Sequence, residues 1–268
     1  MAAARPLVSV VIRTFDRPDF LREAVRSALA QTMTDREVLV VNDGGADVAP
    51  VLEPLAGGDA VRLLDRKKKL GRCAAANWAL AESRGKYLSY LDDDDVYFPE
   101  HLETLVEAAR ESLSAVVYSD AYCARQKKDP STGRYATVSR SVELSKDFDP
   151  VLFFTESYIH LVTVMHERAC YESLGGFDES LPVLEDHDLF LRYAQYHVFR
   201  HVRKTTAEYR IRDDGTNAVT ALQKEFVETR EKLFHKYAHL AVGHLIGRVG
   251  DLSARVAALE ARTGGGAR

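Results

Sequence analysis

Four consecutive aspartates at positions 92–95 are the residues of this chain best suited to chemistry. Carboxylates this close repel one another, and the repulsion raises the pKa of some of them. A divalent cation relieves the conflict, and hard cations such as Mg²⁺ and Mn²⁺ prefer carboxylate oxygens and often share them with substrate phosphates. The tetrad therefore indicates a metal or nucleotide site, with a solvated acidic turn as the alternative. An EF-hand is a poor fit, because its alternating ligands, central glycine and closing glutamate are missing.

A second acidic cluster occupies positions 185–188 and directly precedes the apolar residues Leu189, Phe190 and Leu191. This order places the cluster at the N-terminus of a helix, where the helix dipole stabilises negative charge. The dipole alone accounts for acidic residues there, and the other interpretation is that one carboxylate is a general base. The spacing leaves both open.

Further polar residues lie where elements begin or end. Asp43 follows an apolar run and either caps a turn or binds a ligand, and Asp16 either caps the next helix or binds a ligand. Arg72 and Asn77 flank a predicted helix start, where the dipole and a basic side chain together favour a phosphate. The lysines at 67–69 are more typical of a solvated run than of a binding site.

Alternating strands and helices position these groups. Strands are predicted at 8–12, 37–41, 61–64, 87–91 and 115–119. Between them apolar residues recur at helical spacing, with helix starts near Pro18, Gly71 and Pro99. This alternation predicts an α/β protein with a mostly parallel sheet, and ligands bind such sheets at the carboxyl ends of the strands. We therefore expect the polar residues of 13–16, 42–45 and 92–95 to share one pocket.

The rest of the chain is predicted to be a loop or hairpin at 126–146, a helix at 184–196 and a continuous helix from about residue 219. One face of the last helix carries apolar residues alternately three and four apart, as in a heptad repeat: Val242, Leu245, Val249, Leu252, Val256 and Leu259. We expect one domain at 1–218, C-terminal helices at 219–262 and a flexible tail at 263–268. The helices are interpreted as a homodimerising coil or the start of a linker, although Gly243, Gly247 and Gly250 weaken the repeat.

Composition narrows the class of protein. The 268 residues are 46% hydrophobic, enough for a sizeable core, and the net charge of −4 argues against a nucleic-acid-binding protein. The odd, widely spaced Cys73, Cys123 and Cys170 predict neither a disulfide framework nor structural zinc, and indicate a cytoplasmic protein. No stretch approaches the roughly 20 apolar residues of a membrane span. A peripheral contact at the inner face of the membrane is left open.

Taken in order, the motifs resemble those of family 2 glycosyltransferases with the GT-A fold. The segments that carry the resemblance are SVVIRTFDR at 9–17, VVNDGG at 40–45, GRCAAAN at 71–77, LDDDD at 91–95, GGFDE at 175–179 and LEDHDL at 184–189. Each motif is weak alone, and together they are specific. The resemblance covers roughly residues 7–215 and leaves the C-terminal helices outside.

The resemblance implies an inverting, metal-dependent hexosyl- or deoxyhexosyltransferase. Its donor would be a nucleoside-diphosphate sugar of the UDP or dTDP type, and its cofactor Mn²⁺ or Mg²⁺. The acceptor would be a hydroxyl of a glycan or lipid-linked glycan in cell-surface polysaccharide synthesis. Two alternatives come from other classes of protein. One is a sugar-nucleotide nucleotidyltransferase, which typically carries a glycine-rich N-terminal loop that is absent from this sequence. The other is a non-catalytic sugar-nucleotide-binding module.

The same resemblance implies roles for the nucleotide-binding residues. Thr14, Asp16 and Asp43 would line the base and ribose pocket, with Asp43 accepting a hydrogen bond from the base. Arg72 would lie near the nucleotide, and Asp92 would approach the ribose.

It also implies the catalytic and metal-binding residues. Asp94 would hold the metal on the diphosphate, with Asp95 as an additional ligand. Asp186 would be the catalytic base, with Glu185 beside it and Arg192 in support on the same helix.

Two departures from the family pattern concern the first and last motifs. Arg13, Phe15 and Asp16 stand in a motif that often reads Pro-Thr-Tyr-Asn. Arg212 stands near the place where many relatives carry a histidine, so Arg210 or Arg212 is expected to meet the diphosphate instead.

Overall fold

The computed structural model describes residues 5–55, 61–217 and 221–264, and the side chains of 257 and 259–264 lie outside the description. Its N-terminal half is a parallel sheet in the order β3-β2-β1-β4. The strands are β1 (Val8–Thr14), β2 (Arg36–Asp43), β3 (Val61–Arg66) and β4 (Tyr87–Asp92). The helices between them are α1 (Pro18–Leu29), α2 (Ala49–Leu52) and α3 (Arg72–Glu82).

The same sheet continues past β4 with mixed directions, in the order β8-β6-β9-β5. The added strands are β5 (Val96–Tyr97), β6 (Val116–Lys128), β7 (Tyr135–Ser141), β8 (Val164–Glu167) and β9 (Phe199–Arg212). Strand β8 is antiparallel to both β4 and β6, β9 is parallel to β6, and β7 forms a hairpin with β6. The predicted α/β class is confirmed, as is a hairpin in 126–146. The parallel part is confined to the first four strands and the β6–β9 pair.

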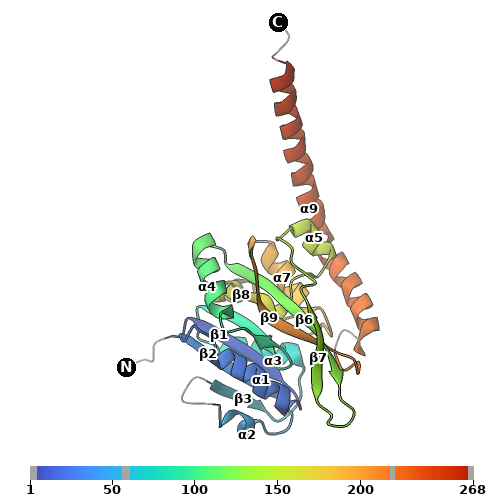
Figure 1. The fold of residues 1–268 in the computed structure, drawn as a ribbon. Coiled ribbons are helices and arrows are strands. Elements are labelled where there is room, and N and C mark those ends of the chain that lie inside the picture. The colour runs from blue at the N-terminus through green and yellow to red at the C-terminus, as the bar shows by residue number, and fades with distance from the viewer. Residues whose placement is uncertain (1–4, 56–60, 218–220, 265–268) are drawn as a thin grey trace.

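The remaining helices cover this sheet on both sides (Figure 1). They are α4 (His101–Ser112), α5 (Pro150–Thr155), the 3₁₀ helix η1 (Leu161–Thr163), α6 (Arg168–Leu174), α7 (Glu185–Ala194) and α9 (Gln223–Gly264). None of the helices in the described ranges is long and apolar enough to cross a bilayer.

Strand β1 shows why the sheet is buried on both faces. Successive side chains of a strand point to opposite faces. Val10 and Ile12 pack in one core with α1 and α4, whereas Val11 packs in the other core with α3 and α7. The uninterrupted β-branched run therefore serves two layers of helices, and the polar residues begin only where the strand ends.

The C-terminal helix α9 has two parts. Its first turns pack on the body through Leu233 and Tyr237, which are buried, and through Phe234, whose ring lies 5.2 Å from that of Phe154 in α5. Farther along, the helix projects away from the rest of the molecule (Figure 1). The predicted C-terminal helical appendage is confirmed, whereas the division into units at residue 218 stays a prediction. Residues 219 and 265–268 lie outside the described residues.

Candidate functional site

The first contact between the acidic clusters runs through Arg13, near the carboxyl end of β1. In the parallel register Arg13 lies beside Asp92 of β4. Its guanidinium donates to Asp92 Oδ1 at 2.5 Å from Nη2 and 3.1 Å from Nε, and its Nη1 lies 3.4 Å from Glu185 Oε1. One buried arginine therefore joins the tetrad to the second acidic cluster.

The second cluster begins helix α7. Glu185 is 5% exposed, and its Oε1 also lies 3.0 Å from Arg72 Nε, at the start of α3. A series of alternating charges thus crosses four elements, from Asp92 through Arg13 and Glu185 to Arg72. The two clusters, 90 residues apart in the sequence, share a site.

Asp186 stands in this site without an ion-pair partner among the described residues. Its carboxylate accepts from the backbone N–H of His187 at 2.8 Å. Burial and the negative charge of Glu185 raise the pKa of Asp186 to about 7, against the opposing effects of that N–H and of Arg72. A carboxylate with a pKa near neutrality is suited to general-base catalysis.

The four tetrad carboxylates lie in different environments. Burial raises the pKa of Asp92, but the charge and hydrogen bonds of Arg13 outweigh burial and hold this pKa below its ordinary value. Asp93 is buried and accepts from Thr14 Oγ1 at 2.8 Å, and burial together with the charge of Asp94 raises its pKa to about 7. Burial and the charges of Asp94 and Asp92 raise the pKa of Asp95 well above its ordinary value.

Asp94 is held by two arginines. Its Oδ2 accepts from Arg212 Nη1 at 2.7 Å and from Arg17 Nη1 at 3.1 Å. The Arg212 side chain is 1% exposed, and its guanidinium lies 5.0 Å from the centre of the Phe20 ring. Both charges are therefore directed at the carboxylate that was predicted to hold the metal.

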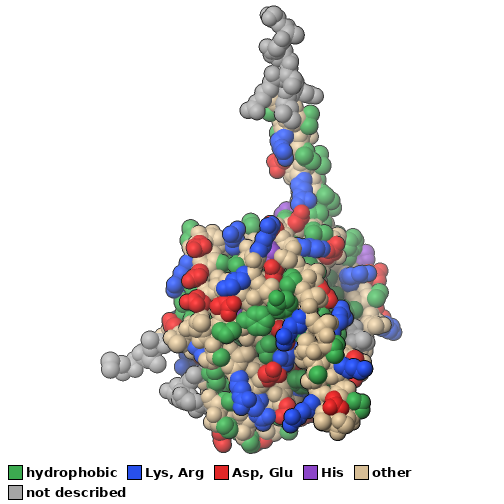
Figure 2. Space-filling model, in the orientation of Figure 1, with side chains coloured by type: hydrophobic (Ala, Val, Ile, Leu, Met, Phe, Trp, Pro, Cys, Tyr) green, Lys and Arg blue, Asp and Glu red, His purple; other side chains and the backbone are tan. Residues whose placement is uncertain are grey.

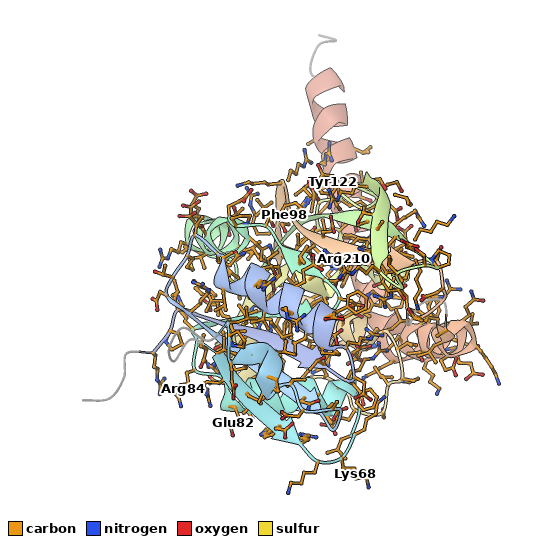
Figure 3. All side chains as sticks on the ribbon, turned by 60° about the horizontal axis from the view of Figure 1, so that its bottom comes forward. Lys68, Glu82, Arg84, Phe98, Tyr122 and Arg210 are labelled. Carbon is orange, nitrogen blue, oxygen red and sulfur yellow. The ribbon has the colours of Figure 1, made fainter. Side chains whose placement is uncertain are left out.

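Arg210 is committed elsewhere. Its guanidinium makes a two-pronged ion pair with Glu23 at 2.6 and 2.9 Å and a further bond to Glu208 at 3.1 Å. Only its backbone N–H reaches the tetrad, donating to Asp95 Oδ1 at 3.1 Å. Figure 3 shows Arg210 within the body of the molecule, whereas Lys68 extends outward from a loop at its edge. Of the two arginines that the sequence left open, Arg212 is the one whose side chain meets the tetrad.

The tetrad suits a divalent cation only together with a ligand. Within the described ranges, no three His, Cys, Asp or Glu side chains converge as a metal site by themselves. Burial, together with the charges of neighbouring aspartates, raises the pKa values of Asp93 and Asp95, and a bound cation would favour their ionised forms. Carboxylate oxygens are suitable donors for Mg²⁺ or Mn²⁺, which take their other ligands from phosphates and water. The residues fit such an ion, and the assignment of Asp94 and Asp95 as its donors stays a prediction.

Asp43 and Asp16 fix the loops beside the strand ends. Asp43 accepts from the backbone N–H groups of Leu70 at 3.0 Å and Gly71 at 2.8 Å, and so sets the loop that leads into α3. Asp16 Oδ1 accepts from Ala46 N at 2.7 Å, in the loop after β2. Both carboxylates lie beside the carboxyl ends of β1 and β2, and each binds backbone N–H groups.

Asp16 lies next to the N-cap of α1, as predicted, but it does not cap the helix. The N-cap residue of α1 is Arg17, with no capping bond from its side chain. Asp16 has a left-handed backbone with φ of 55°, and its carboxylate bonds to the loop after β2 instead of capping α1. Short polar residues such as Asp tolerate this conformation.

Asn77 does not flank the start of α3, as the sequence suggested, and its side chain is engaged within the protein. Asn77 lies within α3, and its side chain exchanges two hydrogen bonds with the backbone of Phe177, at 2.8 and 2.9 Å. Arg192 has a similar positional role, because it bonds to Asp188 at 3.0 Å and to the carbonyl of Leu174 at 2.7 Å. These side chains fix the turn before α7, and the described contacts of Arg192 do not include Asp186.

Two members of the site were missed from the sequence. In the sequence Arg17 is only one residue of a motif, and Asp93 is only one of four aspartates. Arg17 contacts Asp93 at 3.3 Å as well as Asp94. A basic residue in the first motif, just past the end of β1 and facing an acidic run after a neighbouring strand, was the available signal.

The sequence is similar to a known family and to several of its members. A family model described as glycosyl transferase family 2 matches residues 9–169. A protein of Rickettsia prowazekii named as an uncharacterized glycosyltransferase is 34% identical over 70% of this chain and 58% of its own length. The chondroitin synthase of Pasteurella multocida is 28% identical over 85% of this chain and 23% of its own length. The chain thus spans less than two thirds of both relatives.

Solved structures share the fold. Staphylococcus aureus TarS in complex with UDP-GlcNAc superimposes with a TM-score of 0.62 and 19% identity, over 77% of this chain and 59% of TarS. The mannosyltransferase PcManGT of Pyrobaculum calidifontis in complex with GDP-Man and Mn²⁺ has a TM-score of 0.62 and 17% identity, over 96% of this chain and 81% of its own. At these identities the likeness concerns the fold alone.

Proposed function

Because the chain belongs to glycosyl transferase family 2 and has the GT-A fold, we propose that it transfers a sugar from a UDP- or dTDP-type donor to an acceptor hydroxyl with inversion. The family and the fold implied by the sequence motifs are both confirmed. The donor type, the metal and the stereochemistry are the proposal. It is supported by the carboxylate of Asp186, which has a pKa of about 7 and lies beside the chain of charges that leads to the tetrad.

Asp186, rather than Glu185, is the proposed base. Glu185 Oε1 is engaged by two guanidinium groups, those of Arg72 at 3.0 Å and Arg13 at 3.4 Å, whereas Asp186 has no such partner within the described residues. Asp186 has a raised pKa and can accept a proton near neutral pH. As the acceptor oxygen attacks the anomeric carbon, Asp186 takes the hydroxyl proton. The bond from the anomeric carbon to the diphosphate oxygen breaks, and the diphosphate leaves with the electron pair.

The donor is proposed to bind at the carboxyl ends of β1, β2 and β4. Thr14 and Asp43, at the ends of β1 and β2, and Asp16 beyond β1 would line the base and ribose, and Asp92 would approach the ribose. Arg72 lies at the start of α3, between this region and Glu185. The two backbone bonds that Asp43 accepts hold the loop at 67–71 in place, so the nucleotide would meet a preformed surface.

The diphosphate is proposed to lie over Asp94 and Asp95. A divalent ion bound by these carboxylates would act as a Lewis acid and stabilise the charge that develops on the leaving diphosphate. Arg17 and Arg212, which contact Asp94 in this structure, would also donate hydrogen bonds to the phosphate oxygens. Arginine binds phosphate as well as carboxylate through its planar fork of N–H donors.

The acceptor is proposed only as a class of molecule, and the location in the cell follows from that class. One relative is named as a chondroitin synthase. We propose a glycan or a lipid-linked glycan as the acceptor of this chain, in the synthesis of a cell-surface polysaccharide. A cytoplasmic location, at the inner face of the membrane for a lipid-linked acceptor, accords with this substrate.

The test of this proposal is a thermal-shift screen of nucleotide sugars with and without Mn²⁺ or Mg²⁺. A ligand that binds only the folded state raises the melting temperature. We expect UDP- or dTDP-sugars to do so more strongly with metal, while nucleoside triphosphates with metal serve as the control for a nucleotidyltransferase. A larger shift with triphosphates, or none with any nucleotide sugar, would contradict the proposal. If a sugar nucleotide binds but is neither transferred nor hydrolysed, the chain is a binding module.

A further inference from the structure

Helix α9 presents two different faces along its length. The line through Leu233 and Tyr237 faces the body and is buried. On the next turn Leu240 and Ala241 still pack against the core. Beyond them, at 3.6 residues per turn, the same line continues through polar residues: His244, Arg248, Asp251 and Arg255. Arg248 still bonds to Asp149 at the N-cap of α5. The face toward the body therefore becomes hydrophilic where the helix leaves it.

A second stripe begins where the helix leaves the body, about a quarter turn around the helix from the first. It consists of five residues whose relative exposure lies between 48% and 63%: Val242, Leu245, Val249, Leu252 and Val256. Ile246 beside them is exposed as well. Figure 2 shows hydrophobic side chains along the projecting helix, clear of the body. An apolar stripe of this regularity on a solvated helix indicates a partner.

The order of residue types within the stripe points to the partner. In heptad notation Val242, Val249 and Val256 occupy a positions, and Leu245 and Leu252 occupy d positions. β-Branched residues at a with leucine at d favour two-stranded parallel coiled coils. We propose that residues 242–256 of α9 pair with the same residues of a second copy of this chain, in a parallel two-stranded coil.

The glycines that weaken the helix lie away from this seam. Gly243 and Gly250 are at b positions and Gly247 is at f, on the outer face of the coil. An added Cβ at any of them would meet no atom within 4 Å. They lower helix propensity without removing a seam contact, so the pair is expected to be weak and dependent on concentration.

Charge favours the parallel direction. Arg248 and Arg255 occupy g positions. In a parallel pair the g residue of one chain faces an e residue of the other, so Arg248 would meet Ser253. In an antiparallel pair the g positions face one another and would oppose arginine to arginine. The parallel pair therefore avoids a like-charge contact and places both catalytic units at the same end of the coil.

This pairing also connects to the catalytic helix. Near the base of α9, Lys236 Nζ and Tyr237 OH both donate to Asp188 Oδ1 at 2.7 Å. Asp188 is fully buried on α7, two residues after Asp186. The coil would thus begin directly beyond the contact that anchors α9 to α7. The pairing itself does not depend on the proposed transfer reaction.

The first test is sedimentation velocity of the purified chain over a wide range of concentration. We expect the wild type to shift from 29.9 kDa toward twice that mass as concentration rises. Val249→Glu places a carboxylate in the seam and should raise the dimer dissociation constant on the order of a hundredfold. Ala254→Glu, the matched control at the outer f position, should leave it unchanged. Circular dichroism of both variants shows whether the helix is retained.

The second test fixes the direction of the helices. Cys73, Cys123 and Cys170 are buried, so a cysteine introduced on α9 would be the exposed one under mild oxidation. Leu252→Cys at a d position should form an intermolecular disulfide, and Ala254→Cys should not. Equal crosslinking of both, or none at 252 in a chain that does dimerise, would overturn the parallel pair.

Other outcomes would also overturn the proposal. A wild-type chain that stays monomeric at every concentration has no self-pairing helix. If that monomer co-sediments with phosphatidylglycerol vesicles, and Val249→Glu abolishes the binding while Ala254→Glu does not, then a membrane surface covers the stripe instead. A dimer that both glutamate variants retain would lie at another surface.

Discussion

The two acidic clusters of this protein differ in how their charge is compensated. In the tetrad, Asp92, Asp93 and Asp94 each contact an arginine guanidinium, from Arg13, Arg17 or Arg212. At the start of α7, Asp186 contacts none among the described residues, although Glu185 beside it contacts two. Three of the four tetrad carboxylates are therefore paired with fixed cations, whereas Asp186 has no ion-pair partner within the described ranges.

This difference corresponds to two tasks in one reaction. A group that receives a diphosphate must balance charge before and after the ligand arrives, and arginines that switch between carboxylate and phosphate provide that balance. A base must instead keep a pKa close to the working pH, which a neighbouring guanidinium would lower. The contrast between Asp94 and Asp186 is therefore the feature to test.

The largest effect is expected from Asp186→Asn. The amide keeps the shape of the side chain but cannot take the proton, and loss of a general base costs about 10²–10⁴-fold in rate. Transfer from a saturating donor should fall by this factor, while the affinity for the nucleotide, measured by calorimetry, stays within about twofold, because Asp186 does not touch the proposed donor site.

Glu185→Gln is the matched comparison for Asp186→Asn, because it is the same change one residue earlier. Since Glu185 holds Arg13 and Arg72, its loss should disturb nucleotide affinity as well as rate. Near-normal turnover of Asp186→Asn would show that the base lies elsewhere.

The next largest effect is expected from Asp94→Ala. Removing a carboxylate that holds the metal should weaken metal-dependent donor binding by at least about tenfold, and should leave the weaker metal-free binding nearly unchanged. Calorimetry with UDP, with and without Mn²⁺, measures both. Asp19→Asn is the control, since Asp19 is an exposed aspartate of α1 that contacts only Arg22. An affinity that does not depend on Asp94 would remove it from the metal site.

Much of this site could be predicted from the sequence. The runs of β-branched residues that end in polar residues located β1, β2 and β4, and the rule for ligand sites in parallel sheets brought 13–16, 42–45 and 92–95 together. Periodicity identified α7 and the long C-terminal helix in the same way. In each case a local pattern was sufficient, because the elements are long and their apolar faces are regular.

What could not be predicted depends on contacts between distant residues. The left-handed backbone of Asp16 directs its carboxylate to the loop after β2, and neither of the two roles that the sequence left open for it included this bond. Arg210 is bound to Glu23 and Glu208, so Arg212 is the arginine that contacts Asp94. Strand β8, which reverses the sheet direction, comes from a short segment with no distinctive period. Spacing along the chain carries no information on which partner an arginine selects.

A pH profile sharpens the comparison further. Asp186 is active only when ionised, and its pKa of about 7 lies well above the ordinary carboxyl value. The ratio kcat/KM should therefore be constant above about pH 8, halve near pH 7 and fall about tenfold for each unit below about pH 6. Donor affinity measured at each pH separates this effect from the titration of Asp93, whose pKa is also about 7. A rate that stays flat down to pH 5 would contradict a base with this pKa.

The same pKa predicts an effect on stability. Because the folded-state pKa of Asp186 is raised, ionisation costs stability, and this cost is absent below the ordinary carboxyl pKa near 4 and grows as the pH rises through 7. Asp186→Asn should therefore raise the melting temperature by about 4 °C at pH 8 and by little at pH 4. Differential scanning calorimetry at the two values measures the difference. An equal rise in the melting temperature at both pH values would mean that ionisation of Asp186 does not destabilise the fold.

The smallest expected effect concerns Arg17, and it probes the other side of the comparison. Arg17 and an incoming metal compete for Asp94 Oδ2, and the Arg17 side chain is 38% exposed, so the ion pair is weak. Arg17→Gln should raise the affinity for Mn²⁺ alone by about threefold, because one competitor is removed. The same variant should lower the affinity for the nucleoside diphosphate, because a phosphate-binding cation is lost. If the affinity for Mn²⁺ rises while the affinity for the nucleoside diphosphate falls, Arg17 exchanges a carboxylate for a phosphate when the ligand binds. Equal losses of both affinities would mean that Arg17 only maintains the conformation of the tetrad.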